Sequence, residues 1–363
     1  MTRIAALVVA VGVFAAAALA HDETTAHRTL EFARLQSPSL GIVATSDAVS
    51  TSHRPHVFIT DDGRWREITP PRVLWQLEAV VFSSPRVGWV VANDCSAGKA
   101  AVYRTSDGGR SWSPASVPAT NCAAGSRLVV SFSDTEHGWI LDISENGNHA
   151  PLVRTSDGGK TLHKVSPTGQ LDGSIVFTTS WDGWASRSDF ASAQQLYATS
   201  DGGERWQHRS LAAPAGWKGA ALFPDAPRFF GQRGVLPVDV VLADRTGVAF
   251  YTTADGGVTW QPGAVHAVDS SIVSPQSPFV RYVPTSIVSP TVWWVAAGRR
   301  RSAVAVTSDA GTSWQHSTLP VGSAEISAGS ARRAWLTTSQ TARALYVTND
   351  GGRSWRRQAL PAP

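Results

Sequence analysis

Short apolar runs separated by turn residues make up most of the chain. Between residues 77 and 117 four such runs follow one another, over 77–84, 86–94, 100–107 and 110–117. Val, Ala, Phe, Tyr and Trp fill the runs, and Gly, Pro, Ser, Asn and Asp bound them, which is the pattern of β-strands joined by tight turns. No segment after residue 20 keeps a 3.6-residue apolar period between helix caps. The pattern predicts an all-β protein.

This four-run unit recurs, and each copy carries the motif T-x-D-x-G-x-x-W between its third and fourth runs. Six copies are clear, beginning with "RTSDGGRSW" at residues 104–112, and a seventh at residues 60–65 lacks two residues before its Trp. The copies lie about 41 to 54 residues apart, a period typical of propellers. The motif aspartates are Asp62, Asp107, Asp157, Asp201, Asp255, Asp309 and Asp350, and the tryptophans of its full-length copies are Trp112, Trp206, Trp260, Trp314 and Trp355.

The motif has a structural interpretation. An Asp side chain accepts hydrogen bonds from the amides of its own turn, and Gly adopts the positive φ angles that such a turn requires. The Trp that follows can bury its ring between neighbouring sheets. We therefore expect these residues to hold turns together, in a single seven-bladed β-propeller of four-stranded antiparallel blades that spans residues 28–361.

The repeat resembles the Asp-box, or BNR, repeat of sialidase-type propellers. A Gly–Trp pair in the second run, as at Gly88-Trp89 and Gly138-Trp139, accompanies D-G-G-x-x-W in several units. This pairing is most similar to the photosystem II assembly-factor propellers and their bacterial relatives. The resemblance extends over about residues 28–359 and implies the propeller fold. It leaves the function open, because Asp boxes occur in enzymes, receptors and scaffolds alike.

The N-terminus has the features of a secretory signal peptide. Arg3 precedes an apolar or small run from Ile4 to Ala20, which ends in an A-x-A pattern. We expect cleavage after Ala20, a flexible stretch over residues 21–27, and a mature protein without a membrane span that is secreted or held in the periplasm or cell envelope. An uncleaved membrane anchor is the alternative. The net charge of +4 is mild, and the basic residues form no dense stripe along the sequence. We therefore expect no nucleic-acid partner. We also expect a monomer.

Cys95 and Cys122 are the only cysteines. Cys95 falls in the second-to-third turn of the second unit, and Cys122 in the connection to the third unit, so both belong to the same face of a propeller. Export would place them in an oxidising compartment. We predict a disulfide between them, with two separate thiols as the alternative.

Candidate catalytic residues are few. A sialidase-type site needs three arginines, a Tyr–Glu pair and an acidic Asp, but four of the five tyrosines stand two residues before a motif Thr and follow the repeat. Each motif offers one carboxylate, which its own turn can use, so we expect no catalytic residue, no metal site and no cofactor.

Loops of the second-to-third turns and of the blade connections share one face, where propeller pockets commonly lie. On it we place a candidate binding face made of Trp217, Arg281, Tyr282, Arg299, Arg300 and Arg301. We expect a secreted or envelope, non-catalytic propeller that binds another protein or an envelope component as a binding or assembly scaffold. The alternative is a sialidase-type glycoside hydrolase or a carbohydrate-binding propeller, which clustering of Arg281, Tyr282 and a carboxylate would favour.

Overall fold

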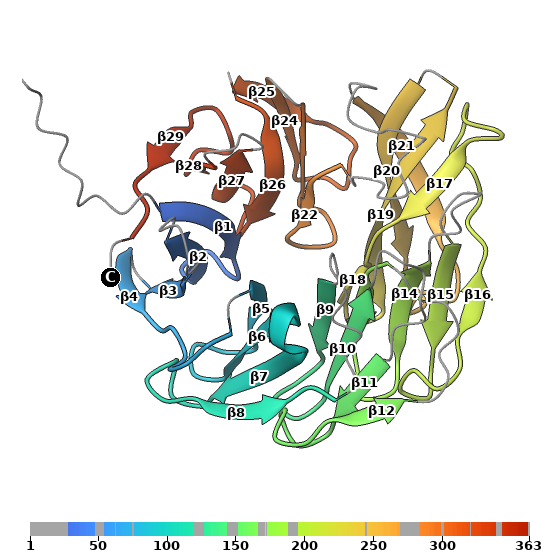
Figure 1. Cartoon of the computed structure of the whole chain (residues 1–363). Coiled ribbons are helices and arrows are strands. Elements are labelled where there is room, and N and C mark those ends of the chain that lie inside the picture. The colour runs from blue at the N-terminus through green and yellow to red at the C-terminus, as the bar shows by residue number, and fades with distance from the viewer. Residues whose placement is uncertain are drawn as a thin grey trace, which may run out of the picture.

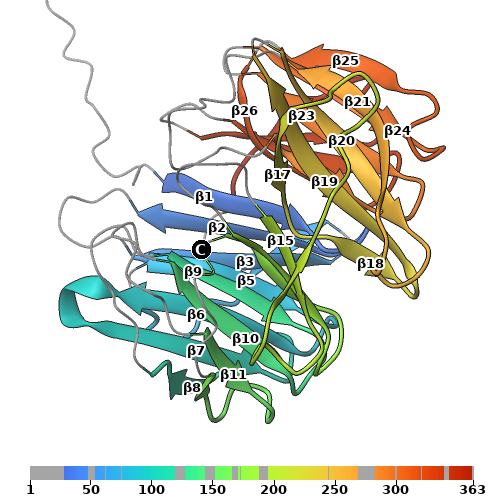
Figure 2. The ribbon, with the colours of Figure 1, turned by 90° about the vertical axis from the view of Figure 1, so that its right-hand side faces the viewer.

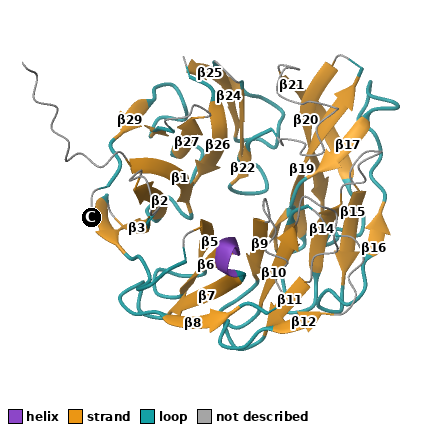
Figure 3. Ribbon diagram, viewed as in Figure 1, coloured by secondary structure: helices purple, strands orange, loops and turns teal. Residues whose placement is uncertain are grey.

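The computed structural model shows seven antiparallel sheets arranged in a ring, which confirms the predicted seven-bladed propeller (Figure 1). In the part of the chain that is described, the only helical segment is a single 3-10 turn, Cys95–Ala97 (Figure 3). The described residues are 28–47, 54–61, 63–74, 76–118, 127–143, 152–165, 171, 173–187, 195–243, 245–268, 283–298, 301–319, 321–338 and 343–361.

Each blade takes consecutive strands from one sequence unit. Blade one contains β1 (Arg28–Leu35), β2 (Gly41–Asp47), β3 (Pro55–Asp61) and β4 (Arg64–Glu67). Blade two contains β5 (Gln76–Phe82), β6 (Gly88–Asp94), β7 (Lys99–Thr105) and β8 (Ser113–Ser116). Blade three contains β9 (Arg127–Phe132), β10 (Gly138–Ile143), β11 (Leu152–Thr155) and β12 (His163–Val165). Blade four contains β13 (Ile175–Phe177), β14 (Gly183–Arg187), β15 (Gln195–Thr199) and β16 (Gln207–Arg209).

Blade five contains β17 (Ala221–Pro224), β18 (Arg228–Phe230), β19 (Arg233–Leu242), β20 (Arg245–Thr253) and β21 (Gln261–Val268). Blade six contains β22 (Thr285–Ile287), β23 (Trp293–Ala297), β24 (Ser302–Thr307) and β25 (Gln315–Leu319). Blade seven contains β26 (Ser323–Ala328), β27 (Ala334–Thr338), β28 (Leu345–Thr348) and β29 (Arg356–Gln358).

Blade five departs from the four-strand pattern. Its strand β19 is ten residues long and pairs along its length with β17, β20 and the short extra strand β18. Figure 2 shows β19 and β20 as long strands, with β18 at one end of the blade. This is the unit whose second run lacks a Gly–Trp pair, so the sequence departure coincides with a different local structure.

The ring closes between two complete blades, because no strand is exchanged between blades one and seven. The Ser327 hydroxyl of β26 accepts a hydrogen bond from the Leu35 amide at 2.9 Å, and Arg343 donates to the Glu31 carbonyl at 2.8 Å. The rings of Trp65 and Trp335 lie 5.8 Å apart across the same boundary.

The core lies between adjacent blades. Trp89 on β6 is fully buried and stacks on Phe132 of β9 in the next blade, with ring centroids 3.8 Å apart. Trp139 on β10 stacks in the same way on Phe177 of β13, at 3.7 Å. Since stacked aromatic pairs add to the gain from buried area, each second-strand Trp joins its blade to the following one.

Candidate functional site

The Asp boxes are closed hydrogen-bonded turns. In blade two the Thr105 hydroxyl donates to the Asp107 carboxylate at 2.8 Å and accepts the Gly109 amide at 2.8 Å. The hydroxyl and amide of Ser111 donate to the two carboxylate oxygens of Asp107, at 2.6 and 2.9 Å. These bonds, led by that of the Ser111 hydroxyl, lower the pKa of Asp107 below its ordinary value. Both oxygens are thus engaged within the turn.

The same turn recurs around four further aspartates, Asp157, Asp255, Asp309 and Asp350. The box of Asp201 differs, because Arg205 stands in place of the Ser or Thr and only its amide reaches the carboxylate. Asp62 lies outside the described residues. Among the residues that are described, no three His, Cys, Asp or Glu side chains gather as metal ligands would.

The box tryptophans divide into two groups. Trp206, Trp314 and Trp355 donate their indole N–H to the second Gly of their own box, at 3.0 to 3.2 Å. The indole nitrogens of Trp112 and Trp260 are buried without such a partner. Their rings still pack in the inter-blade clusters, Trp260 against Phe229 and Trp112 beside Tyr103.

Most box loops are also tied to the preceding blade. The Gly158 carbonyl accepts the Trp89 indole N–H at 2.7 Å, and the Gly202 carbonyl accepts that of Trp139 at 3.0 Å. At other boundaries the equivalent box carbonyl accepts from an outer-strand side chain, Arg66 to Gly108 at 2.6 Å and Gln315 to Gly351 at 2.7 Å.

The boundary between blades four and five lacks this bond. Trp184 on β14 stands where Trp89 and Trp139 stand in their blades and is 7% exposed, yet its indole nitrogen has no hydrogen-bond partner. Its ring is tilted by 34° against Phe229 of the extra strand β18, whereas Trp89 lies within 12° of parallel to Phe132. We attribute the missing bond to this tilt.

A second side chain also differs at the boundary between blades four and five. The guanidinium groups of Arg104 and Arg154 pack along the box loops of the next blades, with Arg104 Nε 2.7 Å from where a Cβ on Gly158 would lie. In blade four the equivalent residue, directly before the box Thr, is Ala198. Ala198 lines the space that remains, and the Gln232 side chain takes the corresponding place beside Gly256, with its Oε1 2.6 Å from where a Cβ on that glycine would lie.

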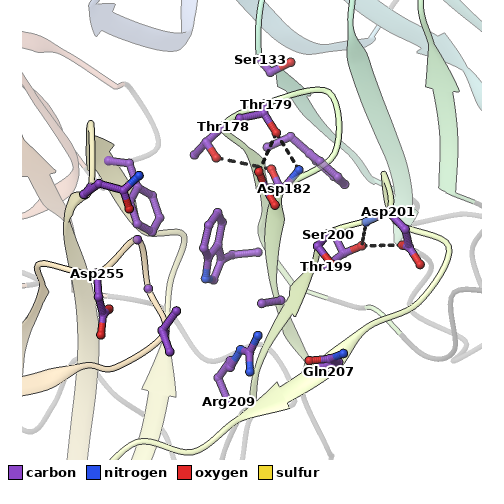
Figure 4. Close-up of a pocket in the computed structure, with 18 of the residues that line it drawn as sticks. Ser133, Thr178, Thr179, Asp182, Thr199, Ser200, Asp201, Gln207, Arg209 and Asp255 are labelled. Carbon is purple, nitrogen blue, oxygen red and sulfur yellow. Dashed lines mark hydrogen bonds between the residues drawn. The ribbon is translucent and has the colours of Figure 1, made fainter.

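The result is a cavity of about 920 Å³ between blades four and five, on the face that carries the Asp boxes (Figure 4). We call it the seam groove. Trp184, Phe229 and Ala198 form its apolar lining, and Arg209 and Gln207 project from β16, with Asp255 across from them (Figure 4).

Two side chains of the seam groove, Trp184 and Arg209, have buried hydrogen-bond donors without a partner. No carboxylate of the described chain lies within salt-bridge distance of Arg205 or Arg209, and the buried Nε of Arg209 has no hydrogen-bond partner. The carboxylates of Asp201 and Asp255 are held in their own boxes, and Asp182 accepts a hydrogen bond from the Thr179 hydroxyl at 3.0 Å.

Two exposed apolar side chains lie at the same place. Val258, 67% exposed, lines the groove, and Trp181, 58% exposed, directly precedes the lining residue Asp182. These are the only large apolar side chains classed as exposed among the residues that the structure describes. An exposed apolar surface beside a cavity is typical of a binding site.

Buried carboxylates join blade five to both its neighbours. Asp225 accepts a hydrogen bond from the Ser174 hydroxyl of blade four at 2.9 Å, and Asp239 accepts the Val283 amide at 2.9 Å. Burial raises the pKa of both groups above the ordinary 3.8, and the charge of Asp225 raises that of Asp239 further.

The predicted binding face is only partly described. Trp217 is half-buried, packs against the core of blades four and five, and has the guanidinium of Arg245 4.5 Å above its ring. Arg301 is exposed in the turn before β24. Arg281, Tyr282, Arg299 and Arg300 lie outside the described residues. Trp217 therefore has a structural role beside any contact it makes.

The predicted disulfide stays a prediction. Cys95 begins the 3-10 turn that joins β6 to β7, and Cys122 lies outside the described residues.

The tyrosines that follow the repeat include Tyr103 and Tyr251, whose hydroxyls donate to the carbonyls of Arg72 and Ala212. Such bonds fix the connections between blades.

Sequence reasoning placed the expected site on the opposite face and missed the seam groove. One signal was present in the sequence, the absent Gly–Trp pair of blade five. Ala198 is no departure from the repeat, since the residue before the box Thr is Arg only in blades two and three. The tilt of Trp184 depends on β18, which no sequence pattern indicated.

Seven blades joined by Asp-box turns make the chain a β-propeller of BNR-type repeats. Residues 59–216 match the family described as Photosynthesis system II assembly factor YCF48. No curated protein matches the chain. The chain is similar to this family over those residues, which are fewer than half of its length.

Solved structures share the fold. YCF48 from Cyanidioschyzon merolae is 18% identical, with a TM-score of 0.51 over 80% of this chain and 87% of that chain. YCF48 bound to a D1 peptide is 19% identical, with a TM-score of 0.49 over 78% of this chain and 80% of that chain. A prolyl endopeptidase structure is 13% identical, with a TM-score of 0.59 over 92% of this chain and 50% of that chain. At these identities the two likenesses with a TM-score above 0.5 are of fold alone.

Proposed function

We propose that this protein is an exported, non-catalytic propeller that binds a protein partner as an assembly or scaffold module. The observation that carries the proposal is the seam groove, a cavity of about 920 Å³ at the boundary between blades four and five, where the Trp184 indole N–H and the Arg209 Nε have no hydrogen-bond partner. Cavities of this size accommodate several side chains of a bound segment.

The groove chemistry supports binding rather than catalysis. Hydrolysis of a glycoside needs one carboxyl group that can give up a proton and a second that can attack or activate water. Asp255 is held ionised by the hydroxyls of Thr253 and Thr259, which lower its pKa, and Asp201 is bonded to its own box. Among the residues that the structure describes, no Tyr or His lines the groove.

The type of propeller supports a protein partner. The matching family is described as an assembly factor, and assembly factors act on other proteins. A carbohydrate partner is the second candidate, favoured by the exposed ring of Trp181, since such a ring can stack on a sugar.

Export is part of the proposal. It rests on Arg3, the apolar run Ile4–Ala20 and its A-x-A end. Fractionation of the native host, followed by N-terminal sequencing, tests it: a mature N-terminus at His21 in the secreted or envelope fraction is expected, and a chain retained in the cytoplasm with Met1 contradicts it. No helix in the described residues is long and apolar enough to cross a membrane.

The binding function is tested with the purified mature protein as bait on envelope extract. We expect a saturable partner that is removed by prior protease treatment of the extract and survives glycosidase treatment. The partner is then purified and its Kd measured. Binding that survives proteolysis and is lost after glycan removal would favour the carbohydrate alternative, and hydrolysis of a glycan by the protein would refute the non-catalytic assignment.

A further inference from the structure

Trp184 carries a donor that three of its equivalents use. Trp89 and Trp139 give their indole N–H to a main-chain carbonyl of the next blade, and Trp294 gives its N–H to the carbonyl of Ser330, also in the next blade. The Trp184 N–H is more than nine-tenths buried and has no acceptor. A buried donor left unpaired destabilises the protein, so an acceptor supplied by a ligand would be bound more tightly for pairing with it.

The hydrogen-bond acceptor of the equivalent tryptophans indicates which group of a bound partner would fit beside Trp184. At two other boundaries the acceptor is a peptide carbonyl of the next blade's box loop. Trp184 keeps the same contact with the loop of blade five, since a Cβ on Gly257 would lie 2.9 Å from its ring. A main-chain carbonyl of an extended segment entering the groove would therefore meet the N–H in the place of the missing box carbonyl.

The lining carries two guanidinium groups, of Arg205 and Arg209, and three carboxylates, of Asp182, Asp201 and Asp255, and the guanidinium groups set a second requirement. Arg209 and Arg205 have no carboxylate partner, and the acids beside them already accept hydrogen bonds from their own turns. A guanidinium group binds a carboxylate through two parallel hydrogen bonds, which no neutral side chain matches. The complementary occupant carries an acidic side chain.

The rim supplies a third element. Val258 lines the groove, and Trp181 precedes its lining residue Asp182. Both are exposed and apolar, so apolar side chains beside the acidic residue would be buried on them. A peptide can alternate acidic and apolar side chains on one main chain, whereas an acidic sugar chain offers no aliphatic side chains to the rim.

We infer that the seam groove binds an extended segment of the protein partner, with an acidic side chain on Arg209 and a main-chain carbonyl on the Trp184 indole N–H. The inference rests on the proposed function and names its site and its recognition chemistry.

The test is a display library of random 12-residue peptides, selected on the immobilised mature protein, with the best peptide measured by fluorescence polarisation. We expect every enriched peptide to contain Asp or Glu. Arg209→Gln should weaken peptide binding by at least 10-fold. Replacing the acidic residue of the peptide by its amide should weaken binding by the same factor. The two changes together should weaken binding no more than either change alone. Trp184→Phe should weaken binding about 5-fold, the loss of one neutral hydrogen bond. The control Arg353→Gln, in the box loop of blade seven, should bind within twofold of wild type.

Three results would overturn the inference. One is no enrichment at all, and another is enriched peptides without acids whose binding ignores Arg209→Gln. The third is tight binding of an oligogalacturonate probe that Arg209→Gln abolishes while peptides fail. Failure here is distinguishable from failure of the proposed function: if the envelope partner binds wild type and Arg209→Gln equally, the protein binds its partner elsewhere, and the function stands without this site.

Discussion

The indole nitrogen of Trp89 donates a 2.7 Å hydrogen bond to the carbonyl of Gly158, 69 residues later and one blade further round the ring. The bond is buried and joins the second strand of one blade to the Asp box of the next. Trp184 occupies the same position two blades on and makes no such bond. This contrast predicts different responses to the same substitution.

Trp89→Phe should lower the free energy of unfolding by about 1–3 kcal/mol, because it removes the bond and leaves the buried Gly158 carbonyl unpaired. Trp184→Phe serves as the matched variant and should cost at least about 1 kcal/mol less, since no bond is lost. Equilibrium urea denaturation measures both. Equal losses would show that the indole bond contributes nothing to the joining of the blades.

Ala310→Gly should stabilise the protein by about 0.5–1 kcal/mol. Ala310 stands in the first Gly position of its box with a φ of 57°, a left-handed conformation that costs an alanine more than a glycine. The reciprocal variant Gly351→Ala, at the same box position of blade seven with a φ of 80°, should destabilise by a similar amount. Thermal melts of the pair check this, and a shift of the same sign in both would contradict it.

The repeat predicted the blades because its residues act locally. Thr105, Asp107 and Gly109 close a turn by themselves, so their spacing in the sequence is enough to place it. The groove was not predictable in the same way. It depends on how the Trp184 ring meets Phe229, and that contact joins two blades through an extra strand that has no counterpart in the other units.

Asp239→Asn should raise the stability at pH 7. Burial raises the pKa of Asp239 well above 3.8, so its folded state favours the protonated form and stability falls as pH rises from about 4 through the raised pKa. The amide keeps an acceptor for Val283 without the charge. We expect a Tm at least about 2 °C above wild type at pH 7, and no difference below pH 4, where both side chains are neutral. A lower Tm at pH 7 would mean that the charge stabilises this boundary.

The box carboxylates should show the opposite pH dependence. The Ser313 hydroxyl and amide and the Thr307 hydroxyl lower the pKa of Asp309 to about 2. Its contribution is complete above the unfolded-state pKa near 4 and is lost as pH falls towards 2. Asp309→Asn should therefore melt below wild type at pH 7, with the gap closing between pH 4 and pH 2. A difference in Tm that stays constant from pH 4 to pH 2 would mean that the substitution acts through the geometry of the turn and not through the charge of Asp309.

The most direct measurement of the central claim is peptide and partner binding by Ala198→Arg. This variant gives blade four the arginine that Arg104 and Arg154 supply in blades two and three, where they pack along the next box loop. The side chain should fill the seam groove and leave the Tm equal to wild type or higher. We predict that the folded variant binds the selected peptide and the envelope partner at least 10-fold more weakly. Binding within twofold of wild type by a folded Ala198→Arg protein would contradict the claim that the open boundary between blades four and five is the docking site.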